Sequence, residues 1–456
     1  MIFRPIAAFV LFIWCVSAVV SPRHSLAAGF SLIRDAEIEN SIRAYSTPVF
    51  RAAQLDPDAV NIYLVNDRTL NAFVAGGQNM FINTGLIMRS DNASQLIGVI
   101  AHETGHIAGG HLSRLKDALS TSSIPSILSY ILGGAASYAT GRGDVGAVII
   151  AGGAGVSQRN FLSYTRGQEA AADHAALKLL DATQQSARGL MEFMQILEDQ
   201  ELLSTRSQDP YVRSHPLSSD RIRTIEHHVD VSPYSDRPPS AEFSEMHARM
   251  KAKVSAYINT PGRTLRTYKE SDPSLEARYA RSVAYFRKAD LDKALVLIDQ
   301  LIAERVNDPY FIEFKAQMLY ENGRIEESLP LYQKASNLVP NSALIRKELA
   351  SAQLGLKRAE LVDPAIQNLR FALRKEPKSA SSWRQLAIAY GMKGDKGQSS
   401  LALAEEALLN DNPDVAKYHA GLAERLYKNG TREWLQAQDI QIAVVDLERR
   451  LKAKKK

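Results

Sequence analysis

Cysteine is almost absent from this sequence. Its 456 residues include a single cysteine, Cys15, which lies in an amino-terminal segment that we expect to be removed on export. A mature chain without cysteine forms no disulfide and offers no thiolate as a nucleophile or metal ligand. Any catalytic site must therefore be built from other side chains.

The amino-terminal segment has the features of a secretory signal peptide. Arg4 supplies a positive charge, residues 6–20 are almost uniformly apolar, and Ser25 and Ala27 are small residues at the two positions that a signal peptidase reads. We expect cleavage close to Ala27, so that residues 1–27 are a signal peptide. The alternative is a membrane anchor, for which the apolar run is short.

An excess of one charge is also missing. The net charge is only +5 for 456 residues, of which 45% are apolar and 23% charged, an ordinary composition for a soluble globular protein. The length suggests two or three domains. The basic tail at residues 451–456 is predicted to be a solvated helix end, and no nucleic-acid partner is expected.

Long apolar stretches are missing from the predicted mature chain as well. The segment 122–156 is rich in Gly, Ala and Ile, but residues 141–144 divide it into two runs, each shorter than the roughly 20 residues of a membrane span. A buried helical pair or a mobile flap is the preferred interpretation, and a membrane-dipping element is the alternative. No transmembrane segment is expected in the mature chain.

Signals of both strands and helices follow residue 28. Residues 60–65 predict a strand, and the segments 73–75 and 80–83 predict a hairpin around a glycine-rich turn. A helix is predicted to begin after Asn92, a good N-cap, with Gln95 completing a capping box. The predicted fold class is mainly α: an α+β domain with a small antiparallel sheet, followed by an α-solenoid.

The carboxy-terminal half carries a helical repeat. Small residues recur with spacings of 34, 34, 37 and 34 residues in one series and of 34, 37 and 34 in a second. The two series are Ser282, Ala316, Ala350, Ala387 and Gly421, and Ala294, Ser328, Ala365 and Ser399. A 34-residue helical period is the signature of tetratricopeptide repeats, in which small residues let paired helices approach closely. We expect about four repeats and a three-residue insertion between Ala350 and Ala365; an irregular bundle is the alternative.

The pattern that carries chemistry is His102-Glu103-Thr104-Gly105-His106. On a helix, histidines at positions i and i+4 share a face, so both imidazoles can bind one metal ion. Glu103 then lies beside the ion, where its carboxylate can take a proton from water. The plain alternative is two surface histidines on a helix.

A catalytic zinc site needs a third protein ligand and one open position. His111 is excluded by helix register, because it lies about 140° around the helix from His106. A carboxylate on a downstream helix is the other known solution, and Glu169 supplies one. Asp173, one turn later, is predicted to accept the spare N–H of a ligand histidine; a plain helix salt bridge is its alternative. Two histidines and a carboxylate also suit metals other than zinc.

Several segments occur in an order that points to a known family. They are Asn71–Gly77, Asn83–Ile87, Val99–His106 with His111, Glu169–Asp173, and Ser214–Pro216 with Arg221 and Ile222. Together they resemble the M48 family of zinc metallopeptidases, and the signal peptide and repeats resemble its periplasmic members that act in outer-membrane protein assembly. One departure is His174, where the family usually has arginine, which puts the usual outer salt bridges in doubt.

The resemblance implies a periplasmic zinc-dependent endopeptidase. One Zn²⁺ would be held by His102, His106 and Glu169, with Glu103 as general base. His215, which precedes a proline, is expected near the metal, either gating the open position or stabilising the oxyanion. The implied substrates are unfolded or misassembled proteins, outer-membrane proteins among them. The implied partner of the repeats is the outer-membrane β-barrel assembly machinery.

The predicted organisation has five parts. They are a signal peptide at 1–27, a zinc metallopeptidase domain at 28–232, a helical linker at 233–274, a tetratricopeptide-repeat domain at 275–450 and a basic tail at 451–456. The strand near Met80–Asn83 could pair with an extended substrate, with an ordinary edge strand as the alternative. The rival function is a repeat-based chaperone or adaptor with a largely latent peptidase half. A membrane-embedded peptidase would need long spans, which the chain lacks.

Overall fold

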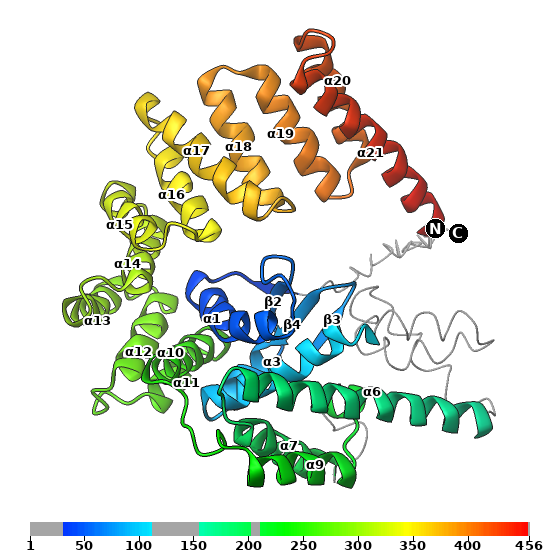
Figure 1. Ribbon diagram of the computed structural model, residues 1–456. Helices are drawn as coiled ribbons and strands as arrows, with labels where there is room; N and C mark the ends of the chain where they lie inside the picture. Colours follow the sequence, from blue (N-terminus) through cyan, green and yellow to red (C-terminus); the bar gives the residue numbers. More distant parts are fainter. Residues whose placement is uncertain (1–30, 112–154, 202–209, 455–456) are drawn as a thin grey trace, which may run out of the picture.

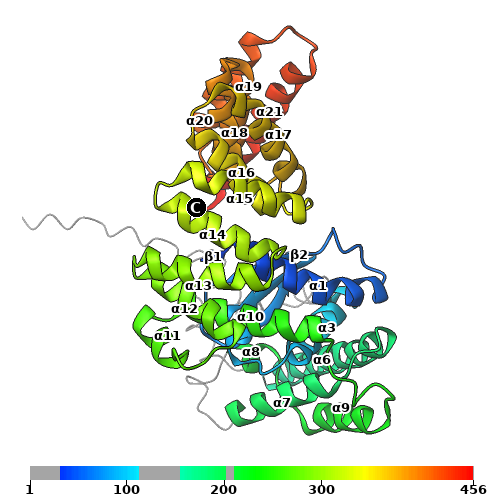
Figure 2. The same cartoon turned by 90° about the vertical axis from the view of Figure 1, so that its left-hand side faces the viewer.

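The computed structural model describes residues 31–111, 155–201 and 210–454. The predicted signal peptide, Cys15 and nearly all of the segment 122–156 lie outside these residues. In Figures 1 and 2, an amino-terminal half built from a sheet and crossing helices carries an arch of paired helices. The mainly helical fold class is as predicted.

The sheet has four strands in the order β1-β2-β4-β3. The strands are β1 (Leu32–Ile33), β2 (Asn61–Val65), β3 (Ala72–Ala75) and β4 (Asn79–Asn83). The β3–β4 hairpin forms as predicted and turns through Gly76 and Gly77, whose φ angles of 58° and 96° favour glycine. The prediction of an antiparallel sheet is wrong in one respect: β4 returns beside β2 and runs parallel to it, so the sheet is mixed.

Strand β4 is an inner strand. Met80 pairs with Ile62 of β2 on one side and with Val74 of β3 on the other. Both backbone edges of β4 are therefore already in use, and the prediction that Met80–Asn83 pairs with an extended substrate is wrong. The outer position in the strand order belongs to β3.

Helices cover this sheet and form the main core with it. They are α1 (Ala36–Ala52), α2 (Thr84–Arg89), α3 (Ala93–Ala108), α6 (Gly155–Ala182), α7 (Arg188–Glu201), α8 (Pro210–Ser214) and α9 (Ser219–Val231). The predicted start of α3 is confirmed: Asn92 accepts the backbone N–H of Gln95 at 3.0 Å, and the Gln95 side chain accepts that of Asp91 at 2.8 Å. Helix α6 is the predicted downstream helix that carries Glu169 and Asp173.

The carboxy-terminal half consists of helical hairpins. They are α12 (Leu275–Arg287) with α13 (Leu291–Glu304), α14 (Pro309–Glu321) with α15 (Ile325–Leu338), α16 (Ala343–Gly355) with α17 (Ala359–Lys375), α18 (Ala380–Lys393) with α19 (Lys396–Leu409), and α20 (Pro413–Leu426) with α21 (Arg432–Lys454). The small residues meet across the hairpins as expected: Ser282 donates to the carbonyl of Ala294, and Ser399 to that of Ala387, both at 2.9 Å.

The predicted insertion lengthens one helix. Helix α17 has 17 residues, whereas α13, α15 and α19 each have 14. The extra residues fall in its first turns, before Ala365, so the solenoid absorbs them without losing its repeat. The last helix, α21, continues to Lys454, so the basic tail begins as a helix end.

Helix α10 (Ala241–Ile258) joins the two halves. Met250 and Val254 belong to the core shared with α1 and α3, whereas Ala252 and Ala256 belong to the core shared with α12 to α14. The short helix α11 (Pro261–Thr267) follows it within the predicted linker. The segment between the halves is therefore packed on both sides.

A group of buried charges also lies where the halves meet, and we refer to it as the joint cluster. Its members are Asp35, Glu37, Arg249, Lys253, Tyr279 and Asp308. Glu37 accepts hydrogen bonds from Tyr279 at 2.6 Å and from Arg249, 2.7 Å away. Lys253 lies 2.7 Å from Asp35, and Arg249 donates to Asp308, the N-cap of α14, at 2.5 Å. Each charge in the cluster is matched by an opposite one.

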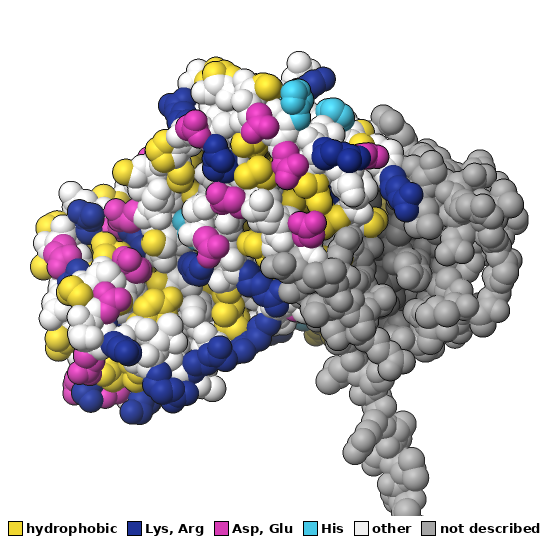
Figure 3. Space-filling view, turned by 90° about the horizontal axis from the view of Figure 1, so that it is seen from below, with side chains coloured by type: hydrophobic (Ala, Val, Ile, Leu, Met, Phe, Trp, Pro, Cys, Tyr) yellow, Lys and Arg dark blue, Asp and Glu magenta, His cyan; other side chains and the backbone are white. Residues whose placement is uncertain are grey.

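The surface mixes charges of both signs. On the face in Figure 3, Lys and Arg side chains alternate with Asp and Glu and with apolar patches over much of the described surface. Among the helices that the structure describes, none combines the length and the apolar character that crossing a membrane requires.

Candidate metal centre

Helix α3 supplies the first three side chains of the site. His102 and Glu103 are fully buried, and His106 is almost so. Gly105 makes this possible, because a Cβ there would lie 2.8 Å from the carbonyl oxygen of Ala172 in α6. The two helices can therefore cross closely enough for side chains of α6 to reach the histidines.

Helix α6 supplies two carboxylates. Asp173 Oδ1 lies 2.8 Å from His102 Nδ1, on the ring edge that points away from the centre. Glu169 faces inward, with its oxygens 3.4 Å from Nε2 of both His102 and His106. This placement agrees with the roles predicted for Glu169 and Asp173, which remain proposals about function.

His215 enters from the turn after α8. Its ring stacks on Tyr211 with a centroid separation of 4.3 Å and an interplanar angle of 29°. Its Nδ1 lies 3.0 Å from Glu169 Oε2 and 3.3 Å from His102 Nε2. Thus the structure brings His215 into the centre itself, and not merely near it.

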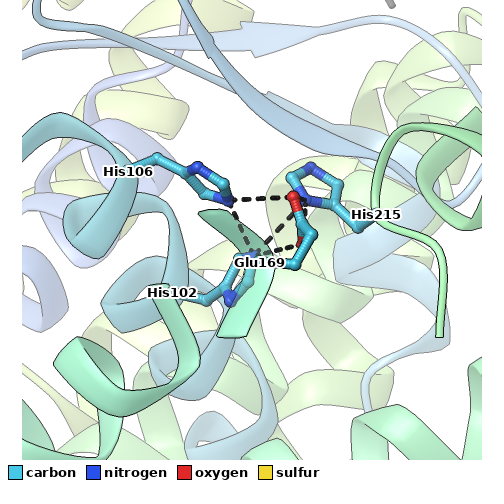
Figure 4. Close-up of side chains that lie close together, drawn as sticks. All are labelled: His102, His106, Glu169 and His215. Atoms are coloured by element: carbon cyan, nitrogen blue, oxygen red, sulfur yellow. Dashed lines mark hydrogen bonds and ion pairs between the residues drawn. The ribbon is translucent and has the colours of Figure 1, made fainter. Parts of the chain in front are cut away.

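Four side chains converge on one point, as Figure 4 shows. One atom from each of His102, His106, Glu169 and His215 lies within 4.8 Å of the others. The two Nε2 atoms of the α3 histidines are 3.1 Å apart. Ligands placed 2.0–2.1 Å from a zinc ion at the corners of a tetrahedron are about 3.3 Å apart. The donor set therefore fits a small divalent ion bound by nitrogen and oxygen.

Glu103 supports the same conclusion. Both of its carboxylate oxygens are buried, and neither has a hydrogen-bond partner among the described residues. Its Oε1 lies 3.5 Å from His215 Nε2. A buried carboxylate without partners is costly, so this side chain is suited to a water molecule or substrate proton beside a bound cation.

Arg221 completes the site and was not predicted as a functional residue. From α9 it donates to Asp173 Oδ2 at 2.6 Å and to the carbonyl of Pro216 at 2.8 Å. It also lies 3.2 Å from Glu169. Arg221 therefore supplies an outer salt bridge to Asp173, which the presence of His174 in place of the family's usual arginine had put in doubt. Its only signal in the sequence was its place in the family pattern.

His111 holds the outer side of His106. The two Nδ1 atoms are 2.9 Å apart, and His111 is not among the four converging side chains. The helix-register argument does not apply, however, because α3 ends at Ala108 and Gly110 turns the chain back at a φ of 61°. A Cβ on Gly109 would lie 2.5 Å from the His111 ring. Sequence reasoning missed this orienting contact.

The charges of the site stabilise one another. Burial lowers the pKa of His102, but hydrogen bonds to Asp173 and Glu169 outweigh it and raise that pKa to about 10. Burial also opposes ionisation of Glu169, yet the neighbouring His215 and His106 hold its pKa well below the usual range. The carboxylate is thus ready for a cation, and a metal ion would compete with the proton for His102.

Comparison with protein families places the site in a known context. Residues 33–229 match the model described as Peptidase family M48, and all residues of the centre lie within that range. The match begins within β1, includes the converging side chains and ends within α9, before α10.

Comparison with curated proteins extends over both halves. The chain is 23% identical over 356 residues to a beta-barrel assembly-enhancing protease of Yersinia pestis, covering 77% of this chain and 71% of that one. It is 22% identical over 393 residues to the beta-barrel assembly-enhancing protease of Escherichia coli K12, covering 84% and 78%. A putative protein of that name from Vibrio cholerae is 24% identical over 374 residues, covering 81% and 76%.

Solved structures resemble the chain only in part. A MamA double mutant is 16% identical and covers 40% of this chain and 97% of its own, with a TM-score of 0.31. PilF of Pseudomonas aeruginosa is 17% identical and covers 43% of this chain and 89% of its own, with a TM-score of 0.27.

Proposed function

We propose that this chain, whose residues 33–229 match the model of Peptidase family M48, is a periplasmic zinc-dependent endopeptidase of protein quality control. The observation that carries the proposal is the convergence of His102, His106 and Glu169 beside the unpartnered carboxylate of Glu103. Zinc over another divalent metal is inferred from this ligand set and from the family. One ion per chain follows from the single cluster of this kind among the described residues.

The proposed chemistry assigns a role to each side chain. A bound zinc ion would polarise the scissile carbonyl and lower the pKa of a water molecule. Glu103 accepts the proton of the attacking water and returns it to the leaving amine. Asp173 accepts the Nδ1–H of His102, so that the Nε2 lone pair points inward. Arg221 holds Asp173 in that position.

His215 is proposed as a gate. With His102, His106 and Glu169 it makes a fourth donor, which leaves no open position for substrate. Its ring must therefore turn away before a peptide can bind, after which it can donate to the developing oxyanion. In this arrangement the enzyme is latent at rest.

The proposed substrates are unfolded or misassembled outer-membrane proteins, and the proposed partner is the β-barrel assembly machinery. This rests on the names of the relatives, which align over both the peptidase half and the repeats. Export of the chain would place it in the same compartment as these clients.

The deciding experiment replaces Glu103 by Gln. General-base loss should lower cleavage of an unfolded protein substrate by a factor of about 100 to 10,000, with metal content unchanged. Glu198→Gln is the matched control, because Glu198 is an exposed glutamate of α7. Wild-type cleavage by Glu103→Gln would refute the peptidase mechanism.

A second function, that of a chaperone or adaptor, is favoured by the position of His215, because a site closed by a fourth donor would leave the peptidase half latent. If the repeats act without proteolysis, cells carrying Glu103→Gln will still assemble outer-membrane proteins. Loss of assembly in Glu103→Gln cells would exclude an independent scaffold role.

A further inference from the structure

A half-open groove lies in the last repeats, far along the chain from the metal centre. It encloses about 430 Å³ and is bordered by α17, α18, α19 and α21. Its lining includes Arg370, Arg374, Trp383, Tyr390, Arg432 and Glu433. We refer to it as the repeat groove. Its volume is in the range of sites that bind small ligands or single side chains.

The floor of the repeat groove is apolar. Leu386 and Ala402 belong to the core of α16 to α19, whereas Leu401 belongs to the next core, formed with α20 and α21. The groove therefore runs along the line where two cores meet. Trp383 is fixed in its wall, because its indole N–H donates to the carbonyl of Pro377 at 2.9 Å.

Tyr390 adds a polar group to this floor. The residue is only 4% exposed. The guanidinium of Arg370 lies 5.5 Å from its ring centroid and also interacts with its hydroxyl, which opposes the rise in the Tyr390 pKa that burial causes. The hydroxyl and the guanidinium therefore form one polar edge of the apolar floor.

The walls of the repeat groove carry arginines. Arg370 and Arg374 lie one turn apart on α17, and Arg432 lies opposite at the start of α21. None of the three has a carboxylate partner within the described chain. Glu433 is the one acidic residue in the lining. The groove thus combines a cationic wall on α17, a single arginine beside Glu433 on α21 and an apolar floor.

Several other cations of the repeats form ion pairs. Arg278, Arg324 and Arg358 each pair with a glutamate, and Lys315 and Lys393 each pair with an aspartate. The arginines that line the repeat groove have no such pair among the described residues, so they can bind the carboxylates of a ligand. Guanidinium groups bind carboxylates in a directed, two-pronged way.

We propose that the repeat groove binds an acidic–aromatic segment of a partner polypeptide. An aromatic side chain would occupy the apolar floor beside Trp383 and Tyr390, and flanking carboxylates would pair with the arginines of the two walls. A polyanion without apolar groups would leave this floor unfilled and would meet Glu433 at the rim. The proposal is independent of the metal centre and of peptide hydrolysis.

The test uses the full mature chain carrying Glu103→Gln, so that no peptide is cleaved. The probe is a short fluorescent peptide with one phenylalanine between acidic residues in a Gly/Ser background, and binding is followed by anisotropy. The double variant Arg374→Glu/Arg432→Glu should weaken binding by about tenfold or more. Tyr390→Phe, which removes only the hydroxyl, should weaken it less.

Matched controls distinguish binding in the repeat groove from non-specific attraction of an acidic peptide to surface arginines. Arg425→Glu changes an exposed arginine of α20 that does not line the groove, and it should bind the probe as the parent does. Peptides with alanine for phenylalanine, or with lysine for the acids, should bind at least about tenfold more weakly.

Three results would overturn the proposal. One is no binding of the acidic–aromatic probe at all, and another is equal weakening by Arg425→Glu and by the double variant. The third is equally tight binding of inorganic polyphosphate or anionic vesicles in competition with the probe, which would identify a polyanion surface. An unchanged circular dichroism spectrum and unfolding temperature of Arg374→Glu/Arg432→Glu show that the variant is folded.

Discussion

The metal centre and the joint cluster are both buried groups of charged side chains, yet they differ in balance. In the joint cluster, Glu37 is matched by Arg249, Lys253 and Tyr279, so its carboxylate is fully partnered. In the metal centre, imidazole nitrogens face one another at 3.1 and 3.3 Å, and Glu103 has no hydrogen-bond partner among the described residues. Buried charge alone does not identify a metal site. An excess of metal-ligating nitrogen and oxygen atoms directed at one point does.

This difference follows from electrostatics. Two opposite charges brought together in a protein interior offset each other's loss of hydration. Several lone pairs directed at one point repel unless a cation or a proton lies between them. One cluster is therefore complete as the chain folds, and the other is complete only with something added. The comparison predicts that metal removal affects the metal centre and that loss of an ion-pair partner affects the joint cluster.

Metal removal should produce the largest difference. In the proposed mechanism a bound metal ion would supply both the electrophile and the activated water, so chelation should abolish cleavage. Chelation should also lower the free energy of unfolding by about 4 kcal/mol relative to protein held at a thousandfold excess of metal over its dissociation constant. Activity assays and thermal unfolding before and after zinc is restored will show this. Full cleavage by metal-free protein would break the comparison.

Replacing Arg249 by Met should lower the stability of the protein without changing the metal centre. It leaves Glu37 and Asp308 without their guanidinium, which should cost about 3–5 kcal/mol of stability, while metal content remains unchanged. Urea unfolding measures the loss. Arg305→Met is the control, since Arg305 forms an exposed pair with Glu245 and should cost less than about 1 kcal/mol. Equal losses would mean that the joint cluster is not a buried network.

Asp173→Asn should have a moderate effect confined to the metal. An amide is a weaker acceptor for the His102 N–H, so metal affinity should fall about 10- to 100-fold. Competition with a chromophoric chelator measures this directly. Asp220→Asn, at an exposed surface pair, should leave affinity unchanged. An unaltered affinity for Asp173→Asn would reduce Asp173 to a helix salt bridge.

His111→Ala should give the smallest change. Loss of its contact with His106 frees that ring to turn, and metal affinity should fall by about tenfold, the lower end for such partners. Gly109→Ala should act in the same direction, because its Cβ would displace the His111 ring. Opposite effects of the two substitutions on chelator competition would show that His111 does not orient His106.

Local signals in the sequence predicted much of this structure. The N-cap at Asn92, the turn at Gly76 and Gly77, and the insertion before Ala365 each depend on neighbours in the chain, and each was found where expected. The i, i+4 spacing of His102 and His106 similarly determines that both rings share one face. Such features need no knowledge of the tertiary fold.

Features that depend on distant segments were missed. The parallel pairing of β2 with β4 depends on where the β3–β4 hairpin returns to the sheet, and no local pattern in the sequence determines this. Arg221 lies outside every local motif of metal chemistry, although it ties Asp173 to the carbonyl of Pro216. No spacing rule encodes these contacts.

Helix α10 limits how this protein can be divided or recombined. One face of α10 packs against each half. Tyr45 of α1 donates a hydrogen bond to the Phe243 carbonyl of α10 at 2.9 Å, and the two rings are in edge contact. A fragment cut before Ala241 would uncover the peptidase core, and one cut after Ile258 would uncover the first repeat. A chimaera that joins the two halves of different relatives would therefore fold only where α10 finds matching contact surfaces in both halves. We expect the two halves to be inherited together for this reason.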